Sequence, residues 1–438
     1  MPTILLSLPG LRRGDLDHMP RTRQRIEAGD RRPLKPHAPC VTWPVQANVI
    51  TGKLPRDHGV VANGFYWRDR HEVEMWTAGN EVIEAPQIWD RLHELDPPRR
   101  SAVWFPMLSK RCGADYVCMP APVHHPDGSE SLWCYTKPEM LYGDLMESLG
   151  HFPLQHFWGP LANIESSQWI ARSAAMAFGT LRPDFFFIYL PHLDYAAQKH
   201  GPQSDQAMEA LRELDEVIGE LATSIESAGG PIDWLVVGEY AITEVSHVVY
   251  PNRVLRQRGW LEVAADDQGK ELIDLQNTTA WALVDHQFSH VYVRENDASL
   301  WRKIADSFAS VEGIAEVLVG DERARYALDH PRSGEIVLIS DPDSWQAYYW
   351  WLDDSRAPDF ARTVDIHRKP GYDPVELFFD PATRSIPLDA TLVRGSHGAP
   401  ADRADQLTEI ACSRPGVLAA SQYDDTDVAC IVEQLVRG

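Results

Sequence analysis

The sequence has little that would place the chain among disulfide-rich, membrane-spanning or nucleic-acid-binding proteins. Its six cysteines form no CxxC pair and are sparse over 438 residues, so a disulfide scaffold is not expected. No apolar run approaches the length of a membrane span, and the run from Ile4 to Leu8 lacks the basic segment of a signal peptide. Lys and Arg number 41 against 64 Asp and Glu, which gives a net charge of −23. We therefore expect a cytoplasmic enzyme with neither nucleic acid nor membrane as partner.

What is present is an ordinary globular composition in a chain of ample length. Hydrophobic residues make up 44% and charged residues 24% of the sequence, and 438 residues suit one elaborated domain or two. The acidic balance does not exclude a small phosphorylated substrate, because a local cation or arginine can reverse the field. The oligomeric state cannot be read from these features.

The most informative stretch is residues 40–66. Thr42 comes just before a predicted helix, Trp43 to Thr51, which has Pro44 in its first turn and is closed by Gly52. Thr42 is thus at or near the N-cap, beside unpaired N–H groups that favour a bound phosphate or an alkoxide. On local grounds alone, Thr42 could equally serve only as a cap.

The longer pattern of this stretch resembles the nucleotide pyrophosphatase/phosphodiesterase family of the alkaline phosphatase superfamily. The matching positions are Thr42, Pro44, Thr51, Gly52, Pro55, His58, Gly59 and Asn63. The match is lost at 45–47, where the better-known members carry a polar-aromatic run. The resemblance implies that Thr42 is the nucleophile that takes up the phosphoryl group. It also implies that Asn63, twenty-one residues later, holds a phosphate oxygen.

The metal-ligand positions of the family are only partly kept. Pro9 stands where the family has a first-strand Asp, Gln198 stands at a His position after Asp194, and Tyr240 replaces the His after Glu239. The late His–Gly pair is present at 397–398. The resemblance implies that Asp194, Glu239 and His397, with Thr42 and Gln198, hold a divalent metal, zinc first and manganese or iron as alternatives.

The resemblance also implies the fold. It is an α/β architecture with an alkaline-phosphatase-like central, mostly parallel sheet flanked by helices and a smaller inserted cap-like region. The expected catalytic core is 1–250 and 360–438, with 251–359 as the inserted region. Independently, the continuous apolar run from Asp184 to Leu190 predicts a central parallel strand. Helices are predicted over 86–95, 204–228 and 428–436, and 106–137 are read as loops over the site.

Two further segments carry candidate residues. His367, Arg368 and Lys369 form a basic group in an acidic chain and could bind substrate phosphate or replace a missing ligand, as Tyr240 could. A solvated surface loop is the alternative for this segment. His286 and His290 lie four apart in a segment whose alternation predicts strands, so they are a weak metal signal.

The expected activity is hydrolysis or transfer at a phosphodiester or pyrophosphate through Thr42, with a small phosphorylated substrate as partner. Because three of the six usual ligands are missing, an inactive relative that binds a phosphorylated ligand or a protein partner is the alternative. A phosphonate or sulfate ester hydrolase on the same fold is the third interpretation.

Overall fold

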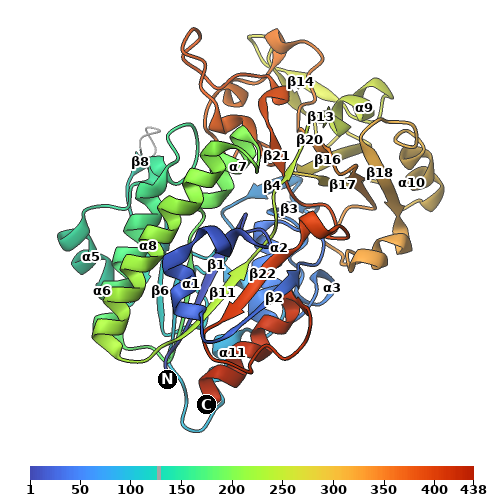
Figure 1. Cartoon of the computed structure of the whole chain (residues 1–438). Helices are drawn as coiled ribbons and strands as arrows, with labels where there is room; N and C mark the ends of the chain where they lie inside the picture. Colours follow the sequence, from blue (N-terminus) through green and yellow to red (C-terminus); the bar gives the residue numbers. More distant parts are fainter. Residues whose placement is uncertain (126–129) are drawn as a thin grey trace.

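A large sheet forms the centre of the computed structural model, which describes residues 1–125 and 130–438 (Figure 1). Its nine strands are β1 (Thr3–Leu8), β2 (Asp30–Lys35), β5 (Ser101–Trp104), β6 (Tyr116–Pro120), β9 (Cys134–Lys137), β10 (Phe185–Tyr189), β11 (Asp233–Gly238), β22 (Thr408–Cys412) and β23 (Tyr423–Asp424). Their order is β23-β2-β22-β11-β1-β10-β5-β6-β9. The run from β11 to β6 is parallel, while β22 and β9 are antiparallel to their neighbours. The sheet is mostly parallel, as predicted.

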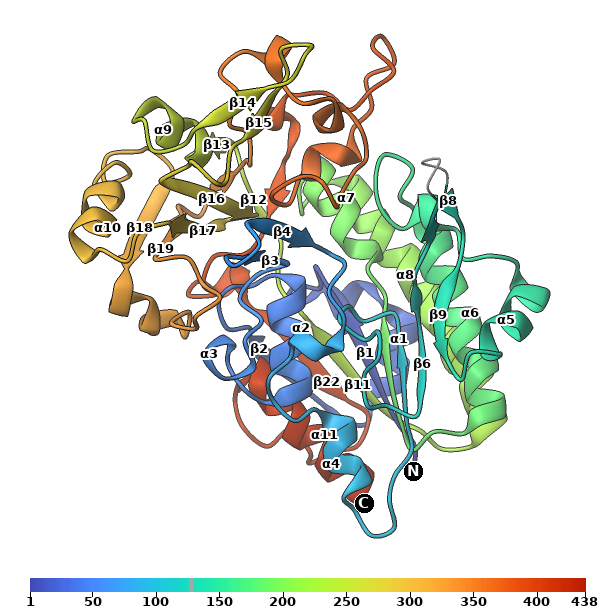
Figure 2. The same ribbon diagram turned by 180° about the vertical axis from the view of Figure 1, so that it is seen from behind.

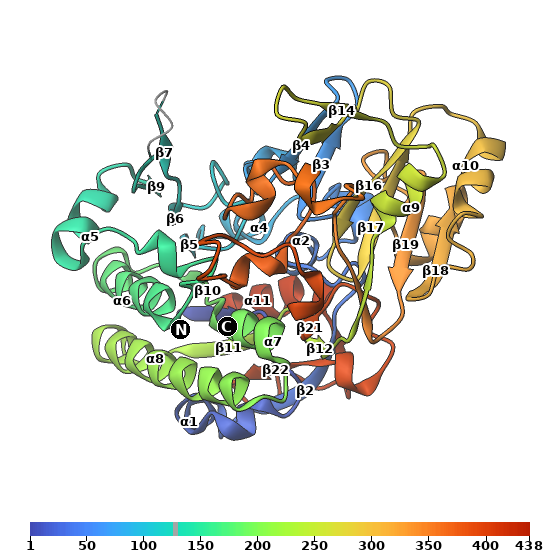
Figure 3. The same ribbon diagram turned by 90° about the horizontal axis from the view of Figure 1, so that it is seen from above.

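Helices cover both faces of this sheet because alternate residues of each strand point to opposite sides. On β1, Ile4 and Leu6 pack with one hydrophobic cluster and Leu5 with another. Viewed from above, α1, α6 and α8 lie on one face and α2, α4 and α11 on the other (Figure 3). The helices are α1 (Pro20–Ile26), α2 (Thr42–Thr51), α3 (Pro55–His58), α4 (Ile88–His93), α5 (Leu141–Leu149), α6 (Ile164–Leu181), α7 (His192–His200), α8 (Asp205–Gly229), α9 (Pro251–Gln257), α10 (Ala298–Ala305) and α11 (Val428–Arg437).

A second, four-stranded sheet lies beside β3 (Gly64–Trp67) and β4 (Glu72–Met75), above one end of α2 (Figure 2). Its antiparallel strands are β16 (Ala280–Asp285), β17 (Phe288–Val293), β19 (Ile336–Ser340) and β18 (Ile314–Val319). They pack in a separate, aromatic-rich hydrophobic cluster. All four strands fall within 251–359, although treating that range as a separate domain stays an interpretation.

Short two-stranded pairings complete the fold. They are β7 (Val123–His124) with β8 (Glu130–Ser131), β12 (Thr243–Glu244) with β21 (Gly395–Ser396), β13 (His247–Val249) with β20 (Ser344–Gln346), and β14 (Val263–Ala265) with β15 (Glu271–Ile273). In the described part of the chain, no helix is long and apolar enough to cross a bilayer.

The prediction that residues 106–137 form loops is wrong in part, because β6 and β9 extend the central sheet there. Its proline, glycine and cysteine content hid two short strands, of which β9 is the edge strand of the sheet. The helix predicted over 86–95 begins only at Ile88, where Gln87 and Asp90 form a capping box. The helix predicted over 204–228 is present as α8, with the side chain of Ser204 as its cap.

Candidate active site

Three parallel strands bring the family's metal-ligand positions to one edge of the sheet. Because β1 lies between β10 and β11, the residues that follow these strands meet at the same edge. Pro9 follows β1, Glu239 and Tyr240 follow β11, and α7, which contains Asp194, follows β10. The Gly10 backbone N–H donates to Tyr240 O at 3.0 Å, so two of these connections touch.

Thr42 is the first residue of α2, one position later than the N-cap, which is Val41. The helix ends as predicted, at Thr51, with Gly52 in the left-handed region at φ 65°. The Thr42 Oγ1 atom lies 3.1 Å from the Tyr240 hydroxyl oxygen. Thr42 also lines a cavity of about 90 Å³. Its hydroxyl is therefore directed to the Tyr240 hydroxyl instead of capping α2.

Asn63 ties the first turn of α2 to the second sheet. Its side-chain Oδ1 accepts a hydrogen bond from the Trp43 backbone N–H at 2.9 Å. Its Nδ2 donates to Asp285 Oδ1 at 3.0 Å, and its backbone N–H donates to Asp285 Oδ2 at 2.8 Å. Asn63 is fully buried. The orientation of its amide is thus fixed within a few ångströms of the helix that begins with Thr42.

Two buried carboxyl groups at this edge each keep one oxygen without a hydrogen-bond partner among the described residues. These oxygens are Asp194 Oδ1 and Glu239 Oε2. The other oxygen of Glu239 accepts from Ser7 Oγ at 2.6 Å and from Gln46 Nε2 at 2.9 Å. Burial raises the pKa of Asp194 to about 7 and that of Glu239 to about 8, because desolvation disfavours the carboxylate. Both groups therefore carry a proton for much of the time near pH 7.

Four aromatic rings form a column beside these acids, in which two of the three ring pairs are stacked and the His397–His286 pair is tilted by 41°. Tyr240 lies against His397 with 3.7 Å between ring centroids and 6° between planes, and His397 lies 3.8 Å from His286. His286 in turn stacks on Tyr372 at 3.6 Å. The Nδ1–H of His397 donates to Cys40 O at 2.7 Å. Burial lowers the pKa of both histidines well below the usual value, so both rings are neutral.

The predicted metal ligands do not fit the metal centre implied by the resemblance. Among the described residues, no three His, Cys, Asp or Glu side chains converge on one point. Asp194 Oδ1 and His397 Nε2 approach to 3.9 Å, beyond hydrogen-bonding distance, and both lack a partner in the described part of the chain. Gln198 accepts a hydrogen bond from the Tyr372 hydroxyl at 2.7 Å. Of the predicted metal ligands, only Asp194 and His397 therefore approach each other among the described residues.

The basic segment predicted near the site is partly buried. Lys369 is 1% exposed, and its Nζ lies 2.8 Å from Asp373 Oδ2 and 2.6 Å from Glu376 Oε1. The alternative of a solvated surface loop is therefore wrong for Lys369. Because two carboxylates balance its charge, Lys369 has no excess positive charge for a phosphate.

The two residues before Lys369, His367 and Arg368, make other contacts. The Nδ1–H of His367 donates to Met75 O at 3.2 Å. Arg368 is ion-paired with Asp365 three residues earlier, and its side chain is 67% exposed. The preceding residue, Ile366, lines the cavity, so this segment reaches the site. A role for His367 or Arg368 in substrate binding stays a prediction.

The cavity next to Thr42 is lined mainly by apolar and aromatic side chains. Its lining comprises Thr42, Trp76, Met107, Phe157, Trp158, Tyr189, Pro191, Asp194, Tyr195, His286, Ile366 and Tyr372. Sequence reasoning did not place His286 there. The signal was available, because only two residues separate the alternating segments around 285 and 288, which is the length of a tight hairpin turn.

A second polar cluster holds the flank of α2 and was also missed. Asp425 accepts hydrogen bonds from the His37 ring at 2.6 Å, the His37 backbone N–H at 3.1 Å and Asn48 Nδ2 at 2.7 Å. The His58 ring donates to Asn48 Oδ1 at 2.8 Å. We call His37, Asn48, His58 and Asp425 the anchor cluster. It connects α2 to the C-terminal segment, which showed no recognisable chemistry in the sequence.

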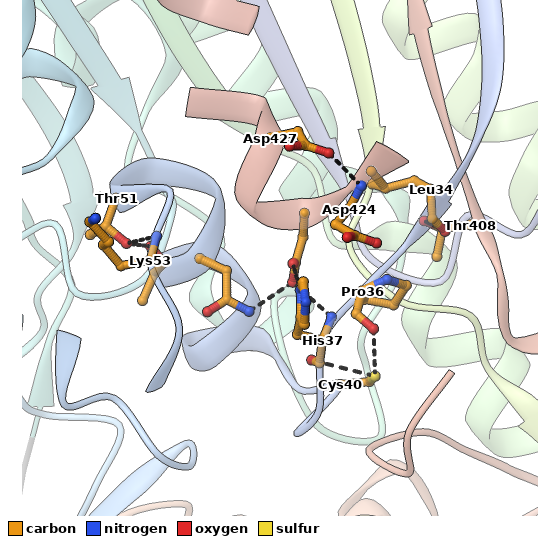
Figure 4. Close-up of polar contacts among 12 residues, drawn as sticks. Leu34, Pro36, His37, Cys40, Thr51, Lys53, Thr408, Asp424 and Asp427 are labelled. Atoms are coloured by element: carbon orange, nitrogen blue, oxygen red, sulfur yellow. Dashed lines mark hydrogen bonds and ion pairs between the residues drawn. The ribbon is translucent and has the colours of Figure 1, made fainter. Parts of the chain in front are cut away.

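The link between the anchor cluster and Thr42 is a short turn. Figure 4 shows the Cys40 thiol directed at the carbonyl oxygens of Pro36 and His37, at 3.7 and 3.6 Å. The Cys40 carbonyl accepts from His397. All six cysteines are free, and burial raises the pKa of the Cys40 thiol well above its usual range. This thiol is therefore a structural group.

Comparisons with known proteins identify the fold and the family of this chain. The chain is similar over its whole length to the crystal structure of phosphonoacetate hydrolase from Sinorhizobium meliloti in complex with phosphonoformate. The TM-score is 0.66 at 17% identity, covering 100% of this chain and 96% of that one. Murine ectonucleotide pyrophosphatase/phosphodiesterase 5 matches at a TM-score of 0.62 and 13% identity, covering 100% of this chain and 95% of that one. At these low identities, the TM-scores establish a shared fold and nothing further.

The comparison with curated proteins gave no match. The family described as type I phosphodiesterase / nucleotide pyrophosphatase matches residues 3–373. That range contains Thr42, Asn63, Asp194, Glu239 and Tyr240, whereas His397 and the anchor residue Asp425 lie beyond it. The match covers most of the chain, and the chain therefore belongs to the type I phosphodiesterase / nucleotide pyrophosphatase family of hydrolases.

Proposed function

We propose that this chain hydrolyses a phosphodiester, a pyrophosphate or a phosphonate, and that the Thr42 hydroxyl is the attacking nucleophile. The observation that carries the proposal is the place of Thr42. Its Oγ1 lies at the first turn of α2, beside the cavity and 3.1 Å from the Tyr240 hydroxyl. The neighbouring structures were determined with phosphonoformate and, for the murine protein in an inactive form, with AMP. Small phosphorylated molecules are thus the proposed substrates.

Thr42 and Asn63 would act at two different atoms of the substrate. Bond formation between Thr42 Oγ1 and phosphorus displaces the leaving group, and water then hydrolyses the phosphothreonine to release the product. We propose that Asn63 Nδ2 donates a hydrogen bond to a non-bridging oxygen during both steps. This amide is supported from behind, because its Oδ1 is bonded to the Trp43 N–H and its Nδ2 to Asp285.

Dependence on divalent metals is general in the family, and zinc, manganese or iron is the finer expectation for this chain. The described donors do not fit that centre. A cytoplasmic location is likewise an expectation from composition. Metal analysis of the purified protein, with and without added zinc or manganese during assay, measures how far this chain follows its family.

Replacement of the proposed nucleophile is the direct test. We expect Thr42→Ala to lower kcat on an activated phosphodiester or phosphonate by at least about a thousandfold, since removal of a nucleophile eliminates the covalent route. Turnover of bis-p-nitrophenyl phosphate and of phosphonoacetate, measured on both proteins, would show it. Thr51→Ala is the matched control, because Thr51 lies at the other end of the same helix, where its hydroxyl donates to Ala47 O and accepts from the Lys53 backbone N–H.

The outcomes separate the interpretations. Thr42→Ala that retains wild-type turnover refutes the nucleophile role. A wild-type protein that turns over none of these substrates but binds AMP in calorimetry would support the alternative of an inactive, ligand-binding relative. Turnover of a sulfate ester in preference to the phosphorus substrates would support the third interpretation.

A further inference from the structure

The cavity beside Thr42 offers a substrate aromatic walls and no positive charge. The rings of Trp158 and Tyr372 have centroids 5.3 Å apart and planes at 49°, and Trp76 meets the same tyrosine at 6.2 Å and 63°. Among the described residues, no lysine or arginine lines this cavity. A second anionic group on a substrate would therefore find no cation there to offset the cost of its desolvation.

The buried lysine of the basic segment supports a wall of this cavity. The Nζ of Lys369 lies 2.8 Å from Asp373 Oδ2 and 2.6 Å from Glu376 Oε1. The other oxygen of Glu376, Oε2, accepts a hydrogen bond from the indole N–H of Trp158 at 2.6 Å. The ion pair and the indole thus form one connected polar network, which restricts the orientation of the Trp158 ring.

The cavity is small as well as apolar. Its volume of about 90 Å³ corresponds to about three water molecules at ~30 Å³ each. Sites for drug-sized ligands have volumes of about 300–1,000 Å³. A compact group therefore fits this cavity better than a nucleoside does. Such a group gains most if it is apolar or aromatic, because its burial against the rings removes both surfaces from water.

We propose that the substrate carries a compact, uncharged apolar group, such as a single aromatic ring, and that Trp158 is the residue that selects this group. The inference rests on the function proposed above, since it assigns the organic part of the phosphorus ester whose phosphorus is attacked by Thr42. The organic group packs against Trp158, Trp76 and Tyr372, and Glu376 is the positioning residue for the indole. Substrates with a second anionic group or a nucleoside are disfavoured.

The test compares phosphonates that differ only in their single organic group. Phenylphosphonate, methylphosphonate and phosphonoacetate are titrated into the purified protein in a calorimeter, with AMP as the larger ligand. We expect phenylphosphonate to bind at least about tenfold more tightly than each of the other three, because an apolar pocket discriminates by size and by the loss of hydration of polar groups. Inhibition constants against an activated phosphodiester should follow the same order.

Two variants of Trp158 test its role. Trp158→Ala should lower the affinity for phenylphosphonate by about 10–100-fold and that for methylphosphonate by less than about threefold, so the preference disappears. Trp158→Phe keeps a ring but lacks the N–H that bonds Glu376, and its preference should lie between those of wild type and Trp158→Ala.

Trp67→Ala is the matched control. Trp67 is also half-buried and its indole N–H also donates to a glutamate, Glu74 at 2.7 Å, but it does not line the cavity. We expect its preference for phenylphosphonate to stay within about twofold of wild type. Circular dichroism of each variant would show that the compared proteins are folded, and the wild-type series tests the substrate class without any variant.

The proposed substrate class is overturned if wild-type protein binds methylphosphonate, phosphonoacetate or AMP as tightly as phenylphosphonate. An unchanged preference in Trp158→Ala overturns the selecting role of this residue, and a wild-type preference in Trp158→Phe overturns the positioning role of Glu376. Failure of the proposed function gives a different result. If Thr42→Ala keeps full turnover while wild type prefers phenylphosphonate, the nucleophile is overturned and the assignment of the cavity is supported.

Discussion

The helix that begins with Thr42 lies between two buried polar clusters that differ in how well their atoms are paired. The anchor cluster, His37, Asn48, His58 and Asp425, contains no buried atom that lacks a partner within the described residues. The opposite holds at the first turn. There Asp194 Oδ1, Gln198 Nε2, Glu239 Oε2 and His397 Nε2 all lack partners among the described residues. The helix is thus firmly held on its flank, whereas the four polar atoms without partners belong to other segments near its start.

An unsatisfied buried polar atom costs about 1–3 kcal/mol, so a group of four is unfavourable for stability alone. Proteins keep such groups where a reactant will pair with them. The fully bonded anchor cluster offsets part of this cost and keeps α2 in place. The anchor cluster therefore stabilises the fold, whereas the four unpartnered atoms are available to bind a ligand.

The largest expected change in stability comes from breaking the anchor cluster. Asp425→Ala removes the acceptor of three hydrogen bonds, from His37 and Asn48, in a position that is fully buried. We expect the free energy of unfolding to fall by about 3–5 kcal/mol, because buried donors are left without partners. Urea unfolding followed by circular dichroism would measure it. Asp427→Ala, at an exposed side chain in the same turn, is the control. A loss under 1 kcal/mol for Asp425→Ala would contradict the anchoring role.

A smaller effect should appear in the pH dependence of stability at the unsatisfied side. The folded-state pKa values of Asp194 and Glu239, about 7 and about 8, lie above their unfolded values near 4. The folded protein thus binds more protons than the unfolded chain between about pH 4 and 8, and its stability falls as pH rises through that window. We expect a loss of at least about 2 kcal/mol between pH 5 and 8.

The double variant Asp194→Asn, Glu239→Gln sharpens this comparison. Neither replacement ionises, so the loss of stability between pH 5 and 8 should become clearly smaller than in wild type. Urea midpoints measured at intervals across the window give the two slopes. Equal slopes for wild type and double variant would show that both carboxyl groups already ionise normally in the folded protein.

The smallest effect is expected at the exposed end of the basic segment. Arg368 is ion-paired with nearby Asp365, its guanidinium lies 5.6 Å from the centre of the Phe360 ring, and its side chain is 67% exposed. Arg368→Ala should change the free energy of unfolding by less than about 0.5 kcal/mol, because exposed ion pairs are screened by water. Thermal unfolding measures this, and a parallel assay of KM tests its predicted part in substrate binding. A drop of more than 1 kcal/mol would mean that the pair is structural.

Much of the fold could be predicted because its signals are local or rest on a motif of the family. The apolar run that became β10 identified a buried parallel strand, and Gly52 marked the end of α2. Ser204 with the amphipathic run after it identified α8. The strands β6 and β9 were missed, because they are short and separated by turn-forming residues.

The candidate site was harder to predict, because its chemistry depends on contacts between distant residues. Asn63 is joined to Asp285 across 222 positions, and Asn48 to Asp425 across 377. Lys369 could be recognised as basic, but its burial between two carboxylates depends on packing that no local pattern encodes. The sequence shows that three of the family's metal ligands are replaced. The column of aromatic rings beside Thr42 could not be predicted, because it forms only when distant segments pack together.

The placement of β22 has a consequence for how this chain can be divided. Although the family match ends at residue 373, β22 inserts between β2 and β11, in the interior of the nine-stranded sheet. Residues 374–438 are thus part of the scaffold and cannot be a detachable tail. A fragment that stopped at 373 would leave β2 without either neighbour and would expose one edge of β11 to self-association, and it would lose both His397 and the carboxylate that holds α2.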